Sequence, residues 1–114
     1  MTRYETPKII DNKLDLSMLV HYIYMNVSEA SITDVFFYPD KSVHIDVVYG
    51  GNDDFVVIDE NGIVIIDNSF FQEFVQQLIT NKTIINCDLK QFLEWSIQQN
   101  VDIEITKRGL RVSF

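Results

Sequence analysis

Residues 31–68, SITDVFFYPDKSVHIDVVYGGNDDFVVIDENGIVIIDN, decide the fold that we expect for this chain of 114 residues. Four runs of β-branched and aromatic residues alternate with short segments rich in Pro, Gly, Asn and Asp, which is typical of strands joined by turns. We therefore predict a four-stranded antiparallel meander. Its first two strands are expected over 32–38 and 43–49, followed by a flexible acidic connection over 50–54 and a hairpin over 55–67.

The hairpin over 55–67 is the best-marked part of this segment. Runs of Val and Ile flank Asn61-Gly62, a dipeptide that accepts the positive φ required at both central positions of a type I′ turn. A two-residue turn at this dipeptide would fix the register of the hairpin. The predicted cross-strand pairs are Glu60 with Ile63, Ile58 with Ile65, and Val57 with Ile66.

The strand over 43–49 predicts a sheet with one buried and one solvated face. Its residues alternate in polarity, and successive residues of a strand point to opposite faces. The residues assigned to one face are Val43, Ile45, Val47 and Tyr49, and those assigned to the other are His44, Asp46 and Val48. The second of these faces is therefore expected to be wet.

Helical patterns precede and follow the meander. The first helix is predicted over 14–28, with Asn12 as its N-cap and Asp15 in its first turn. The second helix begins near Ser69, and the third is capped by Asp88. The residues predicted to face the core are Leu16, Leu19, Val20, Ile23 and Val27 in the first helix, Phe70, Phe71, Phe74, Val75, Leu78 and Ile79 in the second, and Leu89, Phe92, Leu93, Ser96 and Ile97 in the third.

The chain ends in a second predicted hairpin, whose alternating apolar residues place Glu104 opposite Arg111. Residues 83–86 form either a short strand or an extended link. We thus expect one α+β domain over 1–114, preceded by a partly mobile polar arm over 1–11. In it, an antiparallel β-meander packs against an N-terminal helix and two later helices, and a C-terminal β-hairpin completes the fold.

Charge is the most informative feature of the composition. The formal net charge is −8, and residues 29–73 contain ten acids and a single base, Lys41. Such a segment repels DNA, RNA and anionic membranes, and it speeds the encounter with a basic protein. The single Cys87 excludes an internal disulfide, and no charged-then-apolar leader begins the sequence. These features favour a reducing cytoplasm.

The sequence contains no clear catalytic, metal-binding or cofactor-binding motif. The residues before Gly62 lack the spacing of a calcium loop and its terminal acid. His44 and Asp46 share the solvated face, but no nucleophile accompanies them in a recognisable pattern. The run Asp88–Lys90 fits a nuclease signature only loosely. We therefore expect no enzymatic activity, no metal and no cofactor, and keep a metal-dependent enzyme as an alternative.

Three features are candidate partner-binding surfaces. Acids along the strands and turns either are spaced so as to imitate a phosphate backbone or merely make the surface soluble, namely Asp34, Asp40, Asp46, Asp53, Asp54, Asp59 and Glu60. Trp95 lies off the apolar stripe of its helix, so it is either packed under the N-terminal arm or an exposed contact anchor. A second apolar stripe on the first helix is either covered by the terminal hairpin or the contact of a homodimer, and it consists of Leu14, Met18, Tyr22 and Met25.

This combination of a helix, an antiparallel meander and following helices, acidic in the sheet and its loops, resembles the small phage- and plasmid-borne anti-CRISPR proteins that inhibit Cas9. The resemblance covers Leu14–Asn100 in element order and charge. It implies a non-enzymatic inhibitor whose acidic surface binds a basic nucleic-acid enzyme, Cas9 or another nuclease, and blocks guide RNA or DNA binding. An immunity protein or antitoxin for a basic nuclease and a structural homo-oligomer are the alternatives.

Overall fold

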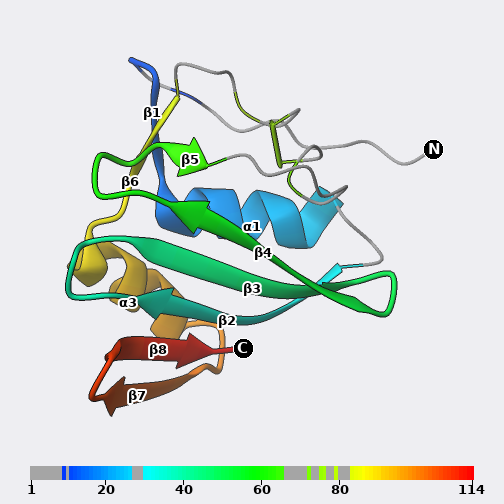
Figure 1. Ribbon diagram of the computed structural model, residues 1–114, viewed down its shortest axis with the longest axis vertical. Coiled ribbons are helices and arrows are strands. Elements are labelled where there is room, and N and C mark those ends of the chain that lie inside the picture. The colour runs from blue at the N-terminus through cyan, green and yellow to red at the C-terminus, as the bar shows by residue number, and fades with distance from the viewer. Residues whose placement is uncertain are drawn as a thin grey trace.

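The structure is an α+β fold in which helices lie on one face of an antiparallel sheet (Figure 1). The computed structural model describes residue 9 and residues 11–26, 30–65, 72, 75, 76, 79 and 83–114. Eight strands and two helices lie in these ranges: β1 Lys13–Asp15, α1 Leu16–Asn26, β2 Ala30–Phe37, β3 Val43–Tyr49, β4 Asn52–Ile58, β5 Val64–Ile65, β6 Ile84–Asn86, α3 Leu89–Ile97, β7 Asp102–Thr106 and β8 Gly109–Ser113. Six of the strands form one sheet in the order β5-β4-β3-β2-β8-β7, while β1 and β6 pair in parallel beside it.

The predicted meander is confirmed as the four antiparallel neighbours β2 to β5. The strand predicted over 43–49 has the bounds of β3, and its alternation separates the two faces of the sheet as expected. Val43, Ile45 and Val47 are buried, whereas His44 and Asp46 are partly exposed. We call the face under α1 and α3 the inner face. The opposite, outer face is not covered by any described helix or strand (Figure 1).

A type I′ turn occurs in the meander, but at Gly50-Gly51. Both glycines have positive φ, +58° and +82°, and Tyr49 pairs with Asn52 on either side of them. A two-glycine loop supplies this backbone without strain from a Cβ atom. The prediction of a flexible connection over 50–54 is therefore wrong for residues 52–54, because β4 begins at Asn52.

The hairpin between β4 and β5 has a longer turn than predicted. Asp59 accepts hydrogen bonds on its carboxylate from the backbone N–H groups of Asn61 and Ile63, at 2.8 and 3.0 Å. The N–H of Gly62 donates to the carbonyl of Asp59, and Gly62 alone of the central pair has positive φ. This is a type I turn followed by a glycine bulge, which adds one residue to the loop. The predicted pairs are thus wrong by one position, and the structure pairs Ile58 with Val64 and Val57 with Ile65.

The first helix begins later than predicted, because the residues before it form a strand. Leu14 and Asp15 belong to β1, which pairs in parallel with β6. Asn12 is not an N-cap; it has φ of +60°, and its carbonyl accepts a hydrogen bond from Ile84 at 2.7 Å. The alternative of a short strand over 83–86 is confirmed. The first residues of the predicted helix therefore form a strand, because they pair with β6, a segment distant in the sequence.

The core lies between the inner face and the helices. α1 buries four of the residues predicted for it, and they are Leu16, Leu19, Val20 and Ile23. Most of the second predicted helix, together with Val27 and nearly all of the arm, lies outside the described residues. Of that second segment, Gln72, Val75 and Ile79 are described and buried. None of the helices in the described part of the chain is long and apolar enough to cross a bilayer.

α3 is capped as predicted, since the Asp88 carboxylate accepts a hydrogen bond from the N–H of Gln91 at 3.2 Å. Phe92 and Ser96 are buried, but Ile97 is 65% exposed and Leu89 39% exposed. The prediction that these last two face the core is wrong. α3 is a short helix of nine residues, and its Phe92 packs against Phe37 of β2 with ring centroids 5.3 Å apart.

The C-terminal hairpin is confirmed, with Glu104 opposite Arg111. What the sequence did not indicate is its place in the fold. β8 pairs antiparallel with β2, so the hairpin extends the sheet of the meander and leaves β7 at its edge. This pairing brings Arg111 beside Phe36, on the outer face.

Candidate functional site on the outer face of the sheet

Three of the predicted acids gather on the outer face. Asp34 of β2 lies opposite Asp46 of β3, and Asp53 of β4 follows on the same face through its pairing with Val48. Asp46 also lies opposite Phe55, whose ring is 43% exposed. We call Asp34, Asp46 and Asp53 the outer-face acids. They form a band of carboxylates across three neighbouring strands.

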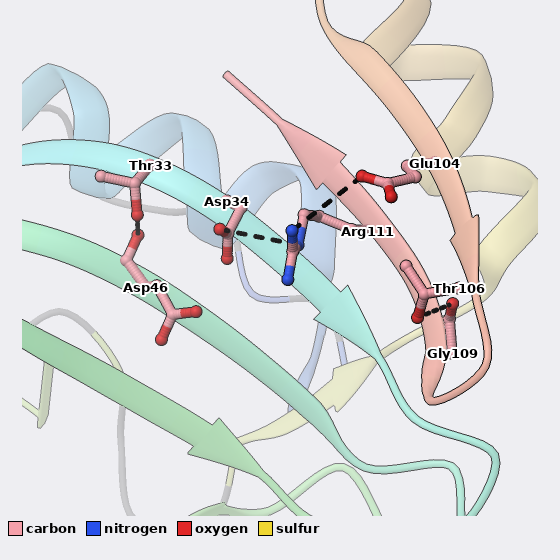
Figure 2. Close-up of polar contacts among 7 residues, drawn as sticks. All are labelled: Thr33, Asp34, Asp46, Glu104, Thr106, Gly109 and Arg111. Carbon is pink, nitrogen blue, oxygen red and sulfur yellow. Dashed lines mark hydrogen bonds and ion pairs between the residues drawn. The ribbon is translucent and has the colours of Figure 1, made fainter.

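A β-bulge puts Asp34 into this band. The register of β2 against β3 shifts between Ile32 and Asp34, so that Thr33 is an extra residue. In regular alternation two residues that are two apart share a face, and Asp34 would have pointed inward with the buried Ile32. The hydroxyl of Thr33 donates to the backbone carbonyl of Asp46 at 3.1 Å, as Figure 2 shows. The bulge thus turns one carboxylate outward to face another.

The proximity of these carboxylates disfavours charge on Asp46. Partial burial is the largest cause. A hydrogen bond that protonated Asp46 donates to the Asp34 carboxylate, the charge of Asp34 and the charge of Asp53 act in the same direction, and together they raise the pKa of Asp46 to about 6. Arg111 acts in the opposite direction. Its guanidinium lies 4.0 Å from Asp34 and 3.9 Å from Glu104, which are ion-pair distances longer than hydrogen bonds (Figure 2). Arg111 therefore compensates the cluster only in part.

Aromatic side chains border the acids. Tyr38 contacts both Phe36 and His44 with ring centroids 4.6 Å apart, and His44 stacks on Phe55 at 6.5 Å. Burial lowers the pKa of His44, and Asp40 opposes this only partly, so His44 is neutral at pH 7. The outer face therefore combines negative charge with apolar surface.

The other four predicted acids lie elsewhere. Asp40 and Asp59 hold the turns after β2 and β4, and each accepts backbone N–H groups within its own turn. Glu60, which is exposed, lies in the same turn as Asp59. Asp54 pairs with Val47, which places it on the inner-face side of β4, and it accepts the N–H of Phe55. The predicted acidic surface is thus divided between the outer face, the turns at one end of the sheet and, for Asp54, the inner-face side of β4.

These turns border a cavity. It has a volume of about 730 Å³ and is lined by the turn after β2, the β4–β5 hairpin, β6 and the start of α3. Lys13 and Lys41 lie among its lining residues together with Asp59 and Glu60. Its charges are therefore mixed.

Trp95 does not join the acids. It belongs to α3 on the inner-face side, and its ring lies 5.5 Å from Phe92 and 6.1 Å from the C-terminal Phe114. It is half-buried against the core and lines a cavity of about 270 Å³ between α1 and α3. Trp95 is thus less exposed than its place off the apolar stripe indicates, because Phe114 packs against its ring, and its role as a contact anchor stays a prediction.

The second stripe of the first helix is also largely covered. Leu14 and Tyr22 are buried, and Met18 packs against the core. Met25 is exposed at 53%. The homodimer contact predicted for these four residues would therefore have little apolar surface.

Among the described residues, we find neither an activated thiol nor a set of side chains arranged to bind a metal ion. Burial raises the pKa of the Cys87 thiol to about 12, with a smaller contribution from Asp59, so the thiol holds its proton at neutral pH. No three His, Cys, Asp or Glu side chains of the described ranges are placed to share a metal ion. Comparison of the chain with protein-family models, with curated proteins and with solved structures gave no match.

Proposed function

We propose that this chain is a non-enzymatic inhibitor that binds a basic surface of a nucleic-acid enzyme through the outer-face acids. The observation that carries the proposal is the meeting of Asp34, Asp46 and Asp53 on an outer face that no described element covers. Cas9 is the partner that the resemblance to anti-CRISPR proteins implies, and the expected effect is a block of guide RNA or DNA binding. The site of action is the cytoplasm of a host bacterial cell.

The electrostatics of Asp46 support a cationic partner. Its raised pKa means that the free protein holds this carboxylate at a cost when it is ionised. A Lys or Arg brought close to it would remove that cost and lower its pKa. Binding would therefore release a proton near pH 6, and affinity would fall as the pH drops below 6 because the protonated Asp46 no longer attracts a cation.

The aromatic border supports a protein partner. Protein interfaces combine desolvated aromatic anchors with a polar rim, and charged pairs at the rim act mainly on the rate of association. Phe55 is exposed and lies directly opposite Asp46. It is the residue that we expect to be buried in the complex.

The test is a competition assay in which labelled guide RNA or target DNA binds the candidate enzyme with and without this protein. We expect the protein to lower nucleic-acid binding, and Phe55→Ala and Asp46→Asn each to weaken that effect about tenfold or more. Ile63→Ala, which shortens an equally exposed apolar side chain in the β4–β5 turn, is the control for Phe55→Ala. Unchanged inhibition by both outer-face variants would refute the proposed surface.

An immunity protein or antitoxin for a basic nuclease would use the same surface chemistry. The assay separates it from a Cas9 inhibitor when it is run on a panel of basic nucleases, since an immunity protein inhibits its cognate nuclease and leaves Cas9 active.

A further inference from the structure

β7 forms one edge of the sheet, and its far side has no partner among the described strands (Figure 1). Edge strands of stable monomers are commonly protected by Pro, by a bulge or by inward-pointing charges. β7 contains no Pro, and its register with β8 is regular from Asp102 to Thr106. Its inner-face residues, Ile103 and Ile105, are apolar, and they are 43% and 84% exposed. β7 therefore lacks these protections and is open to a further strand.

The backbone groups that β7 directs to its open side belong to Ile103 and Ile105. In an antiparallel sheet, alternate residues of a strand bond to one neighbour, and the residues between them bond to the other. The N–H of Phe114 donates to the carbonyl of Thr33 in β2 at 3.0 Å, so the even-numbered residues of β8 bond to β2 and the odd-numbered ones to β7. Ile103 and Ile105 lie opposite even-numbered residues of β8. Their own N–H and C=O groups therefore point away from β8.

The two faces of this edge differ in polarity. Ile103 and Ile105 pair with residues of β8 that belong to the core or pack against it, so they lie on the inner-face side. Asp102 and Glu104 point to the outer face, because successive residues of a strand alternate between faces. Arg111 lies 3.9 Å from Glu104 but is shared with an acid of β2 (Figure 2). It therefore neutralises the acids of β7 only in part.

The acids of β7 decide which strand fits the edge. Lys107 and Arg108 form the turn that follows β7, so both charges within the strand itself are negative. A second copy paired antiparallel over all five residues would put Glu104 of one copy opposite Glu104 of the other, and a parallel copy in register would also put Asp102 opposite itself. Like charges directly opposite each other destabilise a pair of strands. The strand that fits is therefore basic on the outer-face side and apolar on the inner-face side.

We propose that β7 binds an extended segment of a partner protein in which basic and apolar residues alternate. The segment pairs antiparallel with β7, which is the direction of every described pair in this sheet. Its apolar residues lie opposite Ile103 and Ile105 and exchange main-chain hydrogen bonds with them. Its basic residues lie opposite Asp102 and Glu104. In such strand addition, main-chain hydrogen bonds supply the affinity and alternate side chains supply the specificity.

This site goes beyond the proposed inhibition of a nucleic-acid enzyme and does not depend on it. β7 contains none of the outer-face acids, and it uses backbone groups at the edge of the sheet. Failure of the experiments below would therefore leave the competition assay unaffected, and the reverse also holds.

The first test is the binding of a fluorescently labelled heptapeptide of alternating Lys and Val to the full chain, measured by anisotropy. In the antiparallel arrangement the N–H groups of the Val residues face β7, and those of the Lys residues face away. N-methylation of the Val residues should therefore weaken binding about tenfold or more, because it removes main-chain hydrogen bonds. N-methylation of three Lys residues, which leaves the charge the same, is the control and should leave binding unchanged. No binding of the peptide, or equal losses for the two methylated peptides, overturns the proposal.

The second test asks whether the acids of β7 select the basic side chains. Asp102→Asn/Glu104→Gln should weaken binding of the unmethylated peptide about tenfold, which is two exposed ion pairs. Asp11→Asn/Glu60→Gln makes the same charge change at exposed sites outside β7 and should leave the affinity unchanged. Equal losses for the two variants would mean that the peptide responds to total charge, and they overturn the proposed site.

Amide hydrogen exchange, followed by NMR, locates the bound peptide on the chain. The peptide should slow exchange at Ile103 and Ile105, whose N–H groups are open in the free chain, and leave Glu104, which bonds to β8, unchanged. Absence of slowing at Ile103 and Ile105 overturns the proposal. Light scattering of the free chain should give the 13.3 kDa of a monomer. A dimer that the peptide dissociates would identify a second copy as the occupant of the edge and overturn the proposal as well.

Discussion

The two faces of β3 show how one strand serves two purposes. On the inner face, Val43, Ile45 and Val47 are buried against α1 and the rest of the core. On the outer face, partial burial and then the neighbouring carboxylates of Asp34 and Asp53 raise the pKa of Asp46 to about 6, and partial burial lowers the pKa of His44. The inner face contributes most of the stability, whereas the outer face keeps a charge arrangement that opposes folding at neutral pH. Groups held at a cost in this way are candidates for binding.

The largest expected difference between the faces is in packing. Ile45→Ala removes a fully buried side chain and should lower the free energy of unfolding by about 3 kcal/mol. Val48→Ala, on the outer face of the same strand, should cost less than about 1 kcal/mol because the site is partly exposed. Chemical denaturation of the two variants measures both values, and equal losses would contradict the division of β3 into two faces.

A smaller effect of opposite sign is expected at Asp46. Its folded-state pKa lies above the ordinary value of 3.8, so the folded protein binds this proton more tightly, and the resulting stability is lost as the pH rises through about 6. Asp46→Asn should therefore stabilise the protein at pH 7 by about 1 kcal/mol, a value reduced for solvent screening of the half-exposed carboxyl.

Denaturation of Asp46→Asn at several pH values separates charge from packing. The gain should shrink as the pH falls through about 6 and vanish only below about pH 3, under the ordinary pKa of 3.8, where Asp46 is protonated in both the folded and the unfolded state. Asp54→Asn is the control, since its carboxylate accepts a backbone hydrogen bond and the substitution should not stabilise. A gain at Asp46 that is independent of pH would show that crowding of charges is not its cause.

The smallest expected effect belongs to the ion pair at the edge of the outer face. Glu104 lies 3.9 Å from Arg111, and both side chains are substantially exposed. Glu104→Gln should lower the free energy of unfolding by about 0.3 kcal/mol at low salt and by less at high salt. A loss above about 1 kcal/mol in denaturation at low salt would mean that Arg111 contributes more to the outer face than its ion-pair distances indicate.

How far the sequence predicted the fold depended on how strongly each segment distinguishes its two faces. β3 was predicted to the residue because a shift by one position would bury His44 and Asp46. The β4–β5 hairpin was misregistered because Val and Ile occupy consecutive positions in both strands, so their pattern does not choose between registers. The register is set by the longer turn, in which the Asp59 carboxylate accepts the backbone N–H groups of Asn61 and Ile63.

Contacts distant in sequence account for the other differences. Leu14 fits an apolar position of a helix and of a strand equally well, and pairing with Ile85 decided for the strand. The sequence indicates that the meander is acidic. It does not predict that Asp34 lies opposite Asp46, because this pairing depends on the bulge at Thr33, and no Gly or Pro marks a bulge there. Trp95 is less exposed than its place off the apolar stripe indicates, because Phe114 packs against its ring.

The central claim is that carboxylates on the outer face, more than total negative charge, bind a basic partner. The most direct measurement is the affinity for that partner of two variants with equal charge change, Asp34→Asn/Asp53→Asn and Asp11→Asn/Glu94→Gln, the latter at exposed sites away from the outer face. We expect a loss of tenfold or more for the first variant only, and we expect the affinity of the unmodified protein to fall as salt rises. Equal losses for the two variants, or affinity independent of salt, would contradict it.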